Sequence, residues 1–151
     1  MLAASPPRVF CLIRTGADWQ IYAPEDGVEL AVGGTTTLDL TTGLTSPLGE
    51  AISGTPGKFI KVHGVFIEHA AASLATAGVT AFGGASDEFQ GVWAAGDKAT
   101  LAPGRWIAFG MPATDAGVTV DATHKNIALV NLDATALHVA TVNVFVLGKV
   151  A

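Results

Sequence analysis

The chain has 151 residues and a formal net charge of -5, and only 14% of its residues are charged while 50% are hydrophobic. A chain of this length is typical of one domain, whose core is large enough to be stable without disulfides or metals. Its eight Lys and Arg residues form no cluster. Binding to phosphate groups needs concentrated positive charge, so the composition argues against direct contact with DNA or RNA.

The charged fraction is well below the ~25% of a typical soluble domain. Two readings explain a surface with so few charges. A monomer can leave Ala, Val and Gly in water, or the surface can be buried against other copies of the chain or a larger assembly. We favour assembly.

The beginning of the chain predicts an extended arm. It carries neither the basic region nor the long apolar region of a secretory signal, and no apolar run approaches the ~20 residues of a spanning helix. We therefore expect synthesis in a cytoplasm and no membrane contact. Pro6 and Pro7 predict that residues 1–7 form this arm and that residues 8–151 form a single β-sandwich domain. The single cysteine, Cys11, lies in an apolar run and is expected to be buried and inert.

Short runs of β-branched and aromatic residues, separated by Gly, Pro, Asn and Asp, predict strands along the whole chain. The predicted strands are 8–13, 19–22, 28–32, 35–42, 58–69, 79–82, 89–94, 105–109, 118–120, 126–132 and 138–148. A short helix competes over 70–77, and residues 24–27 predict a turn. Turn signals at this spacing, without a sustained helical period, predict an all-β fold: a two-sheet antiparallel sandwich with a jelly-roll or related Greek-key topology.

Alternation within the last predicted strand separates two faces. Val142, Val144 and Val146 form an apolar face that lies against a core. Phe145 and Leu147 belong to the opposite face, which also carries polar groups and meets solvent, a neighbouring strand or a partner subunit. Segments 126–132 and 138–148 are predicted to pair as a β-hairpin across a short polar link.

Other segments carry three further expectations. In the strand 58–69, the face that contains Ile60, Val62, Gly64 and Phe66 is predicted to be the core face. The Gly-, Ser-, Thr- and Pro-rich stretch 43–57 is long for a loop inside a compact domain and is a candidate contact arm, while the β-branched, polar stretch 35–42 suits an edge or solvent-facing strand.

The histidines predict no catalytic or metal site. His63 and His69 are expected on one face of a strand, but ~20 Å apart at a rise of about 3.3 Å per residue, so they do not share a metal. His124 and His138 have aspartates close in the sequence, yet no nucleophile motif accompanies them. We therefore predict a non-enzymatic protein with no catalytic residues, no cofactor and no metal.

The tryptophans offer a different function. Trp19, Trp93 and Trp106 would line a sugar-binding platform if exposed, because aromatic faces stack on pyranose rings, or they would belong to the core or an interface. Six residues are candidates for an interface: Pro6, Pro7, Trp93, Trp106, Phe145 and Leu147.

Two segments at the end of the chain share a pattern with a known family. Residues 126–131 have the pattern Asn-hydrophobic-x-hydrophobic-x-Asn, and residues 141–148 begin Thr-Val-x-Val and finish at Gly. In these segments the chain resembles the closing strands of small β-sandwich structural proteins of tailed bacteriophages. The resemblance implies a capsid decoration, or cement, protein on the head surface of the virion, which binds the major capsid protein and associates with itself, commonly as a trimer. The alternative is a carbohydrate-binding or receptor-binding β-sandwich module of a phage particle.

Overall fold

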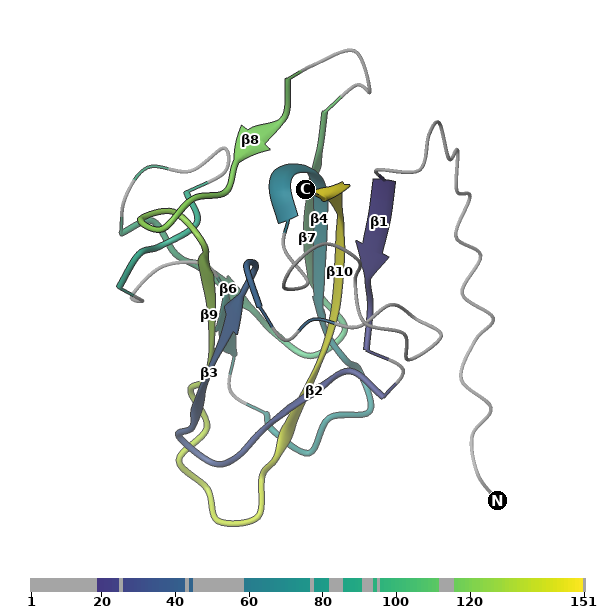
Figure 1. The fold of residues 1–151 in the computed structure, drawn as a ribbon. Helices are drawn as coiled ribbons and strands as arrows, with labels where there is room; N and C mark the ends of the chain where they lie inside the picture. Colours follow the sequence, from purple (N-terminus) through teal and green to yellow (C-terminus); the bar gives the residue numbers. More distant parts are fainter. Residues whose placement is uncertain are drawn as a thin grey trace.

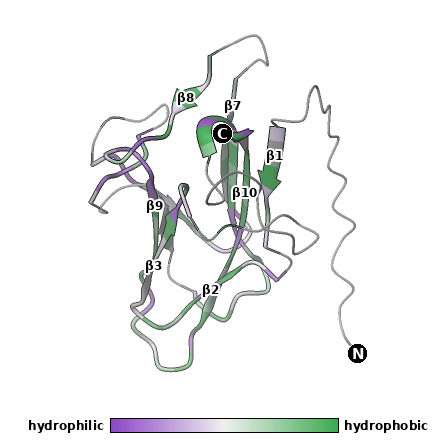
Figure 2. Ribbon diagram, viewed as in Figure 1, coloured by the Kyte–Doolittle hydropathy of each residue, from purple (hydrophilic) through white to green (hydrophobic). Residues whose placement is uncertain are grey.

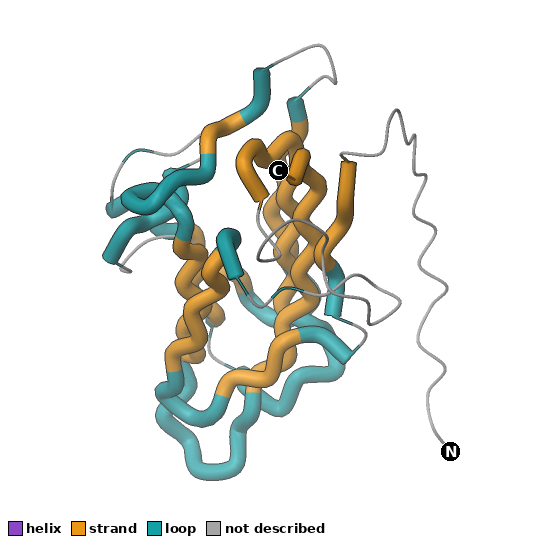
Figure 3. Tube along the Cα trace, viewed as in Figure 1, coloured by secondary structure: helices purple, strands orange, loops and turns teal. Residues whose placement is uncertain are grey.

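The structure is a computed structural model that describes residues 19–24, 26–42, 44, 59–76, 78–81, 86–90, 94, 96–111 and 116–150. These ranges contain ten strands and no helix (Figures 1 and 3). The strands are β1 (Trp19–Tyr22), β2 (Val28–Leu30), β3 (Thr35–Asp39), β4 (Phe59–His69), β5 (Val79–Ala81), β6 (Ala99–Leu101), β7 (Trp106–Gly110), β8 (Val118–Thr119), β9 (Asn126–Asn131) and β10 (Ala140–Val150). The fold is therefore all-β, as predicted, and within the described ranges no helix is long and apolar enough to cross a membrane.

The strands form two antiparallel sheets; in Figure 1, β3, β9 and β6 of one sheet lie to the left of β4, β10 and β1 of the other. The six-stranded sheet has the order β1-β10-β4-β7, with β2 also paired to β10 and β8 also paired to β4. The four-stranded sheet has the order β3-β9-β5-β6. Strands that follow one another in the chain mostly belong to different sheets, so the chain crosses repeatedly between them.

One hydrophobic cluster joins the two sheets. The six-stranded sheet contributes the buried side chains of Ile67 and Val146, and the four-stranded sheet contributes those of Ile127 and Leu129. Figure 2 shows hydrophobic residues along the central strands β4 and β10. The predicted core face of the last strand is confirmed, since Val142, Val144 and Val146 are all buried.

The predicted hairpin between 126–132 and 138–148 is wrong. β9 pairs with β3 and β5, whereas β10 pairs with β1, β2 and β4, so the two segments belong to different sheets. Both strands have an apolar face to bury. Packing these faces against one another removes more apolar surface from water than pairing the strands edge to edge.

The predicted core face of β4 is wrong in part: Val62 is fully buried in the core as predicted, but Ile60 and Phe66 are not. Val65, Ile67 and His69 are buried and point with Val142 to the core, while Phe66 is half-buried on the opposite face and Ile60 is 37% exposed.

Two β-bulges explain this outcome. Leu147 pairs with Gly64 but Gly148 pairs with Val62, so His63 is an extra residue in β4, and Ile60 is a second one near the start of the strand. Each bulge adds one residue and so reverses the side of the sheet to which the following side chains point. The residues of one face therefore do not occupy every second position along the whole strand.

Smaller expectations have mixed outcomes. The turn at 24–27 is confirmed, because the N–H of Gly27 donates to the carbonyl of Pro24 at 3.2 Å and Gly27 has a φ of +74°. β3 is an edge strand, as predicted. Residues 70–76 form turns, so the competing helix is absent from that stretch. The arm 1–7, the strand 8–13, Cys11 and nearly all of 43–57 lie outside the described residues.

Candidate assembly interface

The outer face of the six-stranded sheet carries several apolar residues that lie outside the core. Cross-strand partners point to the same side of a sheet, so the register arranges this face in rows. The central row contains Phe145, Phe66 and Ala108. On one side of it lies the glycine row, Ile21, Leu147, Gly64 and Gly110, and on the other side the tryptophan row, Asn143, Glu68 and Trp106.

The middle of this face is apolar and partly exposed. Trp106 is 62% exposed, and its ring centroid lies 5.8 Å from that of Phe66. Phe66, Phe145 and Leu147 are half-buried. Three of the predicted interface residues, Trp106, Phe145 and Leu147, are therefore brought to one surface. Pro6, Pro7 and Trp93 lie outside the described residues.

A basic row follows beyond the glycine row. This lysine row contains Trp19, Lys149, Lys61 and Thr119 as successive cross-strand neighbours. The Lys149 ammonium lies 5.3 Å from the centroid of the Trp19 ring, and Lys61 Nζ donates to Thr119 Oγ1 at 2.6 Å. Within the described part of the chain, no carboxylate forms an ion pair with either lysine.

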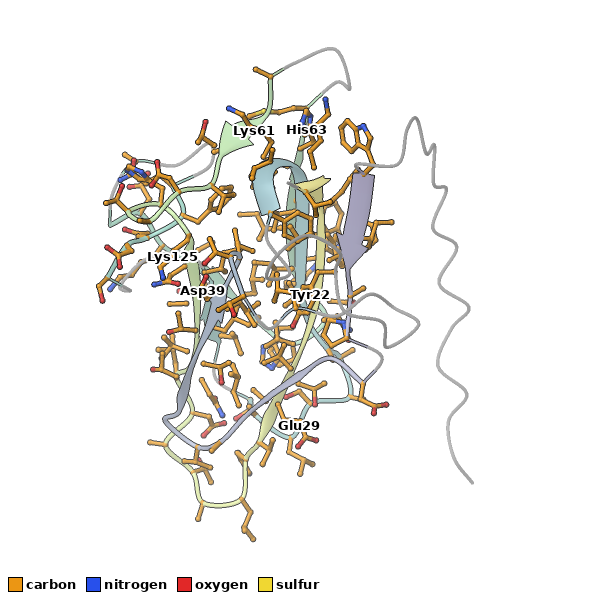
Figure 4. All side chains as sticks on the ribbon, in the orientation of Figure 1. Tyr22, Glu29, Asp39, Lys61, His63 and Lys125 are labelled. Atoms are coloured by element: carbon orange, nitrogen blue, oxygen red, sulfur yellow. The ribbon has the colours of Figure 1, made fainter. Side chains whose placement is uncertain are left out.

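Acidic residues occupy the other end of the same face. Glu68 accepts a hydrogen bond of 2.9 Å from the side-chain amide of Asn143. Glu29 is exposed on β2 beside Thr141, and these two residues form the glutamate row. In Figure 4, Lys61 and His63 lie at one end of the molecule and Glu29 lies toward the other. The outer face is thus basic at one end, apolar in the middle and acidic at the other end.

His63 and His69 lie on opposite faces of the sheet, which corrects the prediction that they share one. The bulge turns His63 outward, where its ring centroid lies 4.4 Å from that of Trp19, under Gly117. His69 is fully buried on the inner face, and its Nδ1 lies 3.0 Å from the carbonyl oxygen of Leu101. Leu101 belongs to the four-stranded sheet, so His69 links the two sheets and has a structural role.

The strongest polar network surrounds Asp133. Its buried carboxylate accepts hydrogen bonds from the backbone N–H groups of Thr76 and Thr135, each at 2.8 Å, and lies 3.0 Å from Nδ1 of His138. The Thr135 N–H, followed by His138 and Thr76, holds the pKa of Asp133 far below its usual range. The carboxylate therefore fixes the connection between β9 and β10 to the turn after β4.

Asn131 completes this network from the end of β9. Its buried side-chain amide donates to the carbonyl oxygens of Leu30, Ala31 and His138 at 3.3, 3.2 and 2.9 Å. Leu30 lies in the six-stranded sheet, so Asn131 also joins the two sheets. These hydrogen bonds indicate that the network stabilises the fold.

The second histidine and aspartate pair is a surface turn. His124 Nδ1 lies 3.2 Å from the Asp121 carboxylate, and both side chains are largely exposed. Hydrogen bonds from the hydroxyl and N–H of Thr123 lower the pKa of Asp121 to about 2. Among the described residues, no group of three His, Cys, Asp or Glu side chains is placed to hold a metal ion.

Sequence reasoning missed several residues of the outer face. Phe66 was assigned to the core because the bulge at His63 is invisible in the alternation. Lys61 and Lys149 are 88 positions apart in the numbering of the sequence, and only the register between β4 and β10 shows that they are neighbours. The sequence carries one related signal, the low charge of the chain, which favours a surface that is buried against another molecule.

No protein-family model matches the chain, and no curated protein matches its sequence.

Proposed function

We propose that the protein is a non-enzymatic structural protein of a phage particle, of the capsid decoration type, and that the outer face of the six-stranded sheet is its subunit interface. The observation that carries the interface is the register that gathers Trp106, Phe66 and Leu147 on one face. Apolar and aromatic residues gathered on a surface are typical of protein contacts. The phage assignment comes from the resemblance of residues 126–131 and 141–148.

The strand order supports a jelly-roll sandwich. The ten strands reduce to eight when β1 is counted with β2 and β7 with β8, since each pair lies along the same neighbour. The order is then first, eighth, third, sixth in one sheet and second, seventh, fourth, fifth in the other. This order supports the proposed jelly-roll topology, an architecture that occurs in viral capsid and lectin domains.

The proposed role needs no titratable site. A decoration protein stabilises a shell by removing surface from water across the boundaries of its neighbours, at about 25 cal/mol per Å² of apolar area. The contacts to the major capsid protein are assigned to residues 1–7 and 43–57, the predicted contact arms, which leaves the sheet face for contacts between copies.

Co-sedimentation with capsids tests the proposal. Heads assembled from the major capsid protein without decoration are mixed with the full chain, and both the bound fraction and the temperature of head disruption are measured. We expect saturable binding and a higher disruption temperature. A variant lacking residues 1–7 should bind heads more weakly while its circular dichroism spectrum is unchanged. A full chain that neither binds nor stabilises heads contradicts the assignment.

Carbohydrate binding is the second candidate, and one observation favours it. The exposed ring of Trp106 lies in the same row as the carboxylate of Glu68, so a sugar ring would find a stacking surface beside a hydrogen-bonding group. Tryptophan fluorescence is measured during titration with a glycan mixture. A shift that is lost in Trp106→Ser, but retained in the equally exposed control Leu74→Ser, supports this candidate. Unresponsive fluorescence removes it.

A further inference from the structure

We infer that a second copy of this chain packs its outer face against the first across a two-fold axis, which runs along the central row and perpendicular to the strands. The inference rests on the proposed function and specifies its subunit interface. It differs from the trimer that the resemblance implies, because an isologous contact of this kind closes as a dimer.

This axis determines which rows meet. It places each strand over its own copy and reverses its direction, so a residue on one side of the central row faces a residue at the same distance on the other side. The glycine row therefore faces the partner's tryptophan row, and the lysine row faces the partner's glutamate row. Each of these pairs is complementary, the first in shape and the second in charge.

The shape complementarity lies on β7. Trp106 and Gly110 are two residues before and two residues after Ala108, which belongs to the central row. Trp106 is the most exposed large side chain of the face, at 62%. Among the residues that the structure describes, no heavy atom would lie within 4 Å of a Cβ at Gly110, and Gly64 beside it also lacks a side chain. The partner's Trp106 would fill the space above Gly110, beside Gly64.

The charge complementarity lies at the ends of β10. Lys149 and Thr141 are each four residues from Phe145, about 14 Å at a rise of roughly 3.4 Å per residue. Thr141 pairs with Glu29, so the axis brings the partner's Glu29 close to Lys149. The partner's Glu68 is two residues from the central row and within reach of the long side chain of Lys61.

The lysine row itself argues for a partner that supplies carboxylates. Lys61 and Lys149 are directly opposite one another on neighbouring strands, and like charges in this position destabilise a sheet. The chain has a net charge of -5, yet within its described part neither lysine has an ion pair. Two carboxylates from the partner would offset this repulsion.

The charges also select the direction of the axis. A two-fold axis parallel to the strands would also pack the two faces together, but it would place each lysine row over the partner's lysine row. Repulsion between four ammonium groups disfavours that arrangement. The perpendicular axis pairs opposite charges at both ends of the interface.

A charge exchange tests the inference. The variant Lys61→Glu/Lys149→Glu has two acidic ends, and the variant Glu29→Lys/Glu68→Lys has two basic ends. Oligomeric state is measured by native mass spectrometry and sedimentation velocity for the wild type, for each variant and for their equimolar mixture. We expect a wild-type dimer, at least tenfold weaker dimers of each variant alone, and a heterodimer in the mixture. A monomeric or trimeric wild type overturns the inference, and so does a mixture that does not recombine.

A second variant tests shape without changing charge. Gly110→Leu fills the space above Gly110, and we expect it to weaken the dimer at least tenfold while the circular dichroism spectrum is unchanged. Thr100→Leu, at an exposed position of the four-stranded sheet, is the matched control and should leave the dimer intact. A Gly110→Leu protein that dimerises like the wild type contradicts the predicted fit.

Head binding in the same preparations separates this inference from the proposed function. A chain that stabilises heads but forms no two-fold dimer retains the decoration role and loses the inferred geometry. A chain that forms the heterodimer but ignores heads retains the geometry and loses the decoration role.

Discussion

The outer faces of the two sheets differ far more than their inner faces do. Both inner faces are built from buried Val, Leu and Ile, which belong to one cluster. The outer face of the four-stranded sheet presents the exposed threonines Thr35, Thr37 and Thr100, whereas that of the six-stranded sheet presents Trp106 and Phe66. Folding requires only the inner faces, so the aromatic residues of one outer face call for a separate explanation, which the proposed subunit interface provides.

The charges differ between the sheets in the same way. Beside the four-stranded sheet, Lys125 forms an ion pair of 2.9 Å with Asp39, and the hydrogen bond that its ammonium donates to the Asp39 carboxylate raises the pKa of Lys125. On the six-stranded sheet, Lys61 and Lys149 are placed next to each other instead. Among the described residues, Lys125 therefore has an ion pair within the subunit, whereas Lys61 and Lys149 have none.

The largest expected effect comes from the inner face of β4. Ile67→Ala removes a fully buried side chain, and we expect it to lower the free energy of unfolding by about 2–5 kcal/mol. The neighbouring change Phe66→Ala, on the half-buried outer face, should lower the stability of the isolated subunit by only about 1 kcal/mol and weaken self-association more. Urea denaturation at several protein concentrations measures both effects.

The two results together sharpen the contrast between the faces. If Phe66→Ala destabilises the monomer as much as Ile67→Ala does, the outer face contributes to the fold itself and the proposed division between inner and outer faces is wrong.

Steric crowding at the bulge gives the next effect. A Cβ at Gly148 would lie 2.3 Å from the carbonyl oxygen of Lys61 and 2.7 Å from Cδ1 of Phe59. Gly148→Ala should therefore cost about 1–3 kcal/mol of stability, as is typical of overpacking. Gly110→Ala, in open space on the same sheet, is the matched control and should cost less than half as much. Equal midpoints of thermal unfolding for the two variants would contradict the crowding at Gly148.

This bulge also marks the limit of what the sequence predicts. The strands at 19–22, 126–131 and around β10 follow from composition and turn signals, and the buried face of β10 follows from simple alternation. The faces of β4 do not follow, because inserting His63 into a long strand leaves no signal in the pattern of apolar residues.

The pairing of strands is the second feature of the fold that the sequence does not predict. Residues 126–132 and 138–148 are close in sequence and separated by a short polar link, so a hairpin was the natural expectation. In the structure the two segments lie in different sheets. Buried Asn131 stabilises this arrangement, because it donates a hydrogen bond to the carbonyl oxygen of Leu30, about a hundred residues earlier. Such a long-range contact, like the adjacency of Lys61 and Lys149, depends on topology and has no local signature.

The Asp133 network predicts a dependence of stability on pH. The pKa of Asp133 is lower in the folded protein than in the unfolded chain, where it is about 3.9. Its stabilisation is therefore fully present above that value and is lost as the pH falls toward the folded pKa. Asp133→Asn should have a lower urea midpoint than the wild type at pH 7, and the gap should narrow below about pH 4. A gap that widens on acidification would contradict the assigned hydrogen bonds.

The smallest effect is expected on the outer face of the four-stranded sheet. Thr37→Val exchanges an exposed hydroxyl for a methyl group in a strand that favours β-branched residues, so the free energy of unfolding should change by no more than about 0.5 kcal/mol. Sedimentation velocity should give the same association constant as for the wild type, whereas Trp106→Ser should weaken association at least tenfold. If Thr37→Val also changed the association constant, both outer faces would lie in contacts between copies. The contrast between the sheets would then not identify the interface, because threonine-lined and aromatic surfaces would be buried alike.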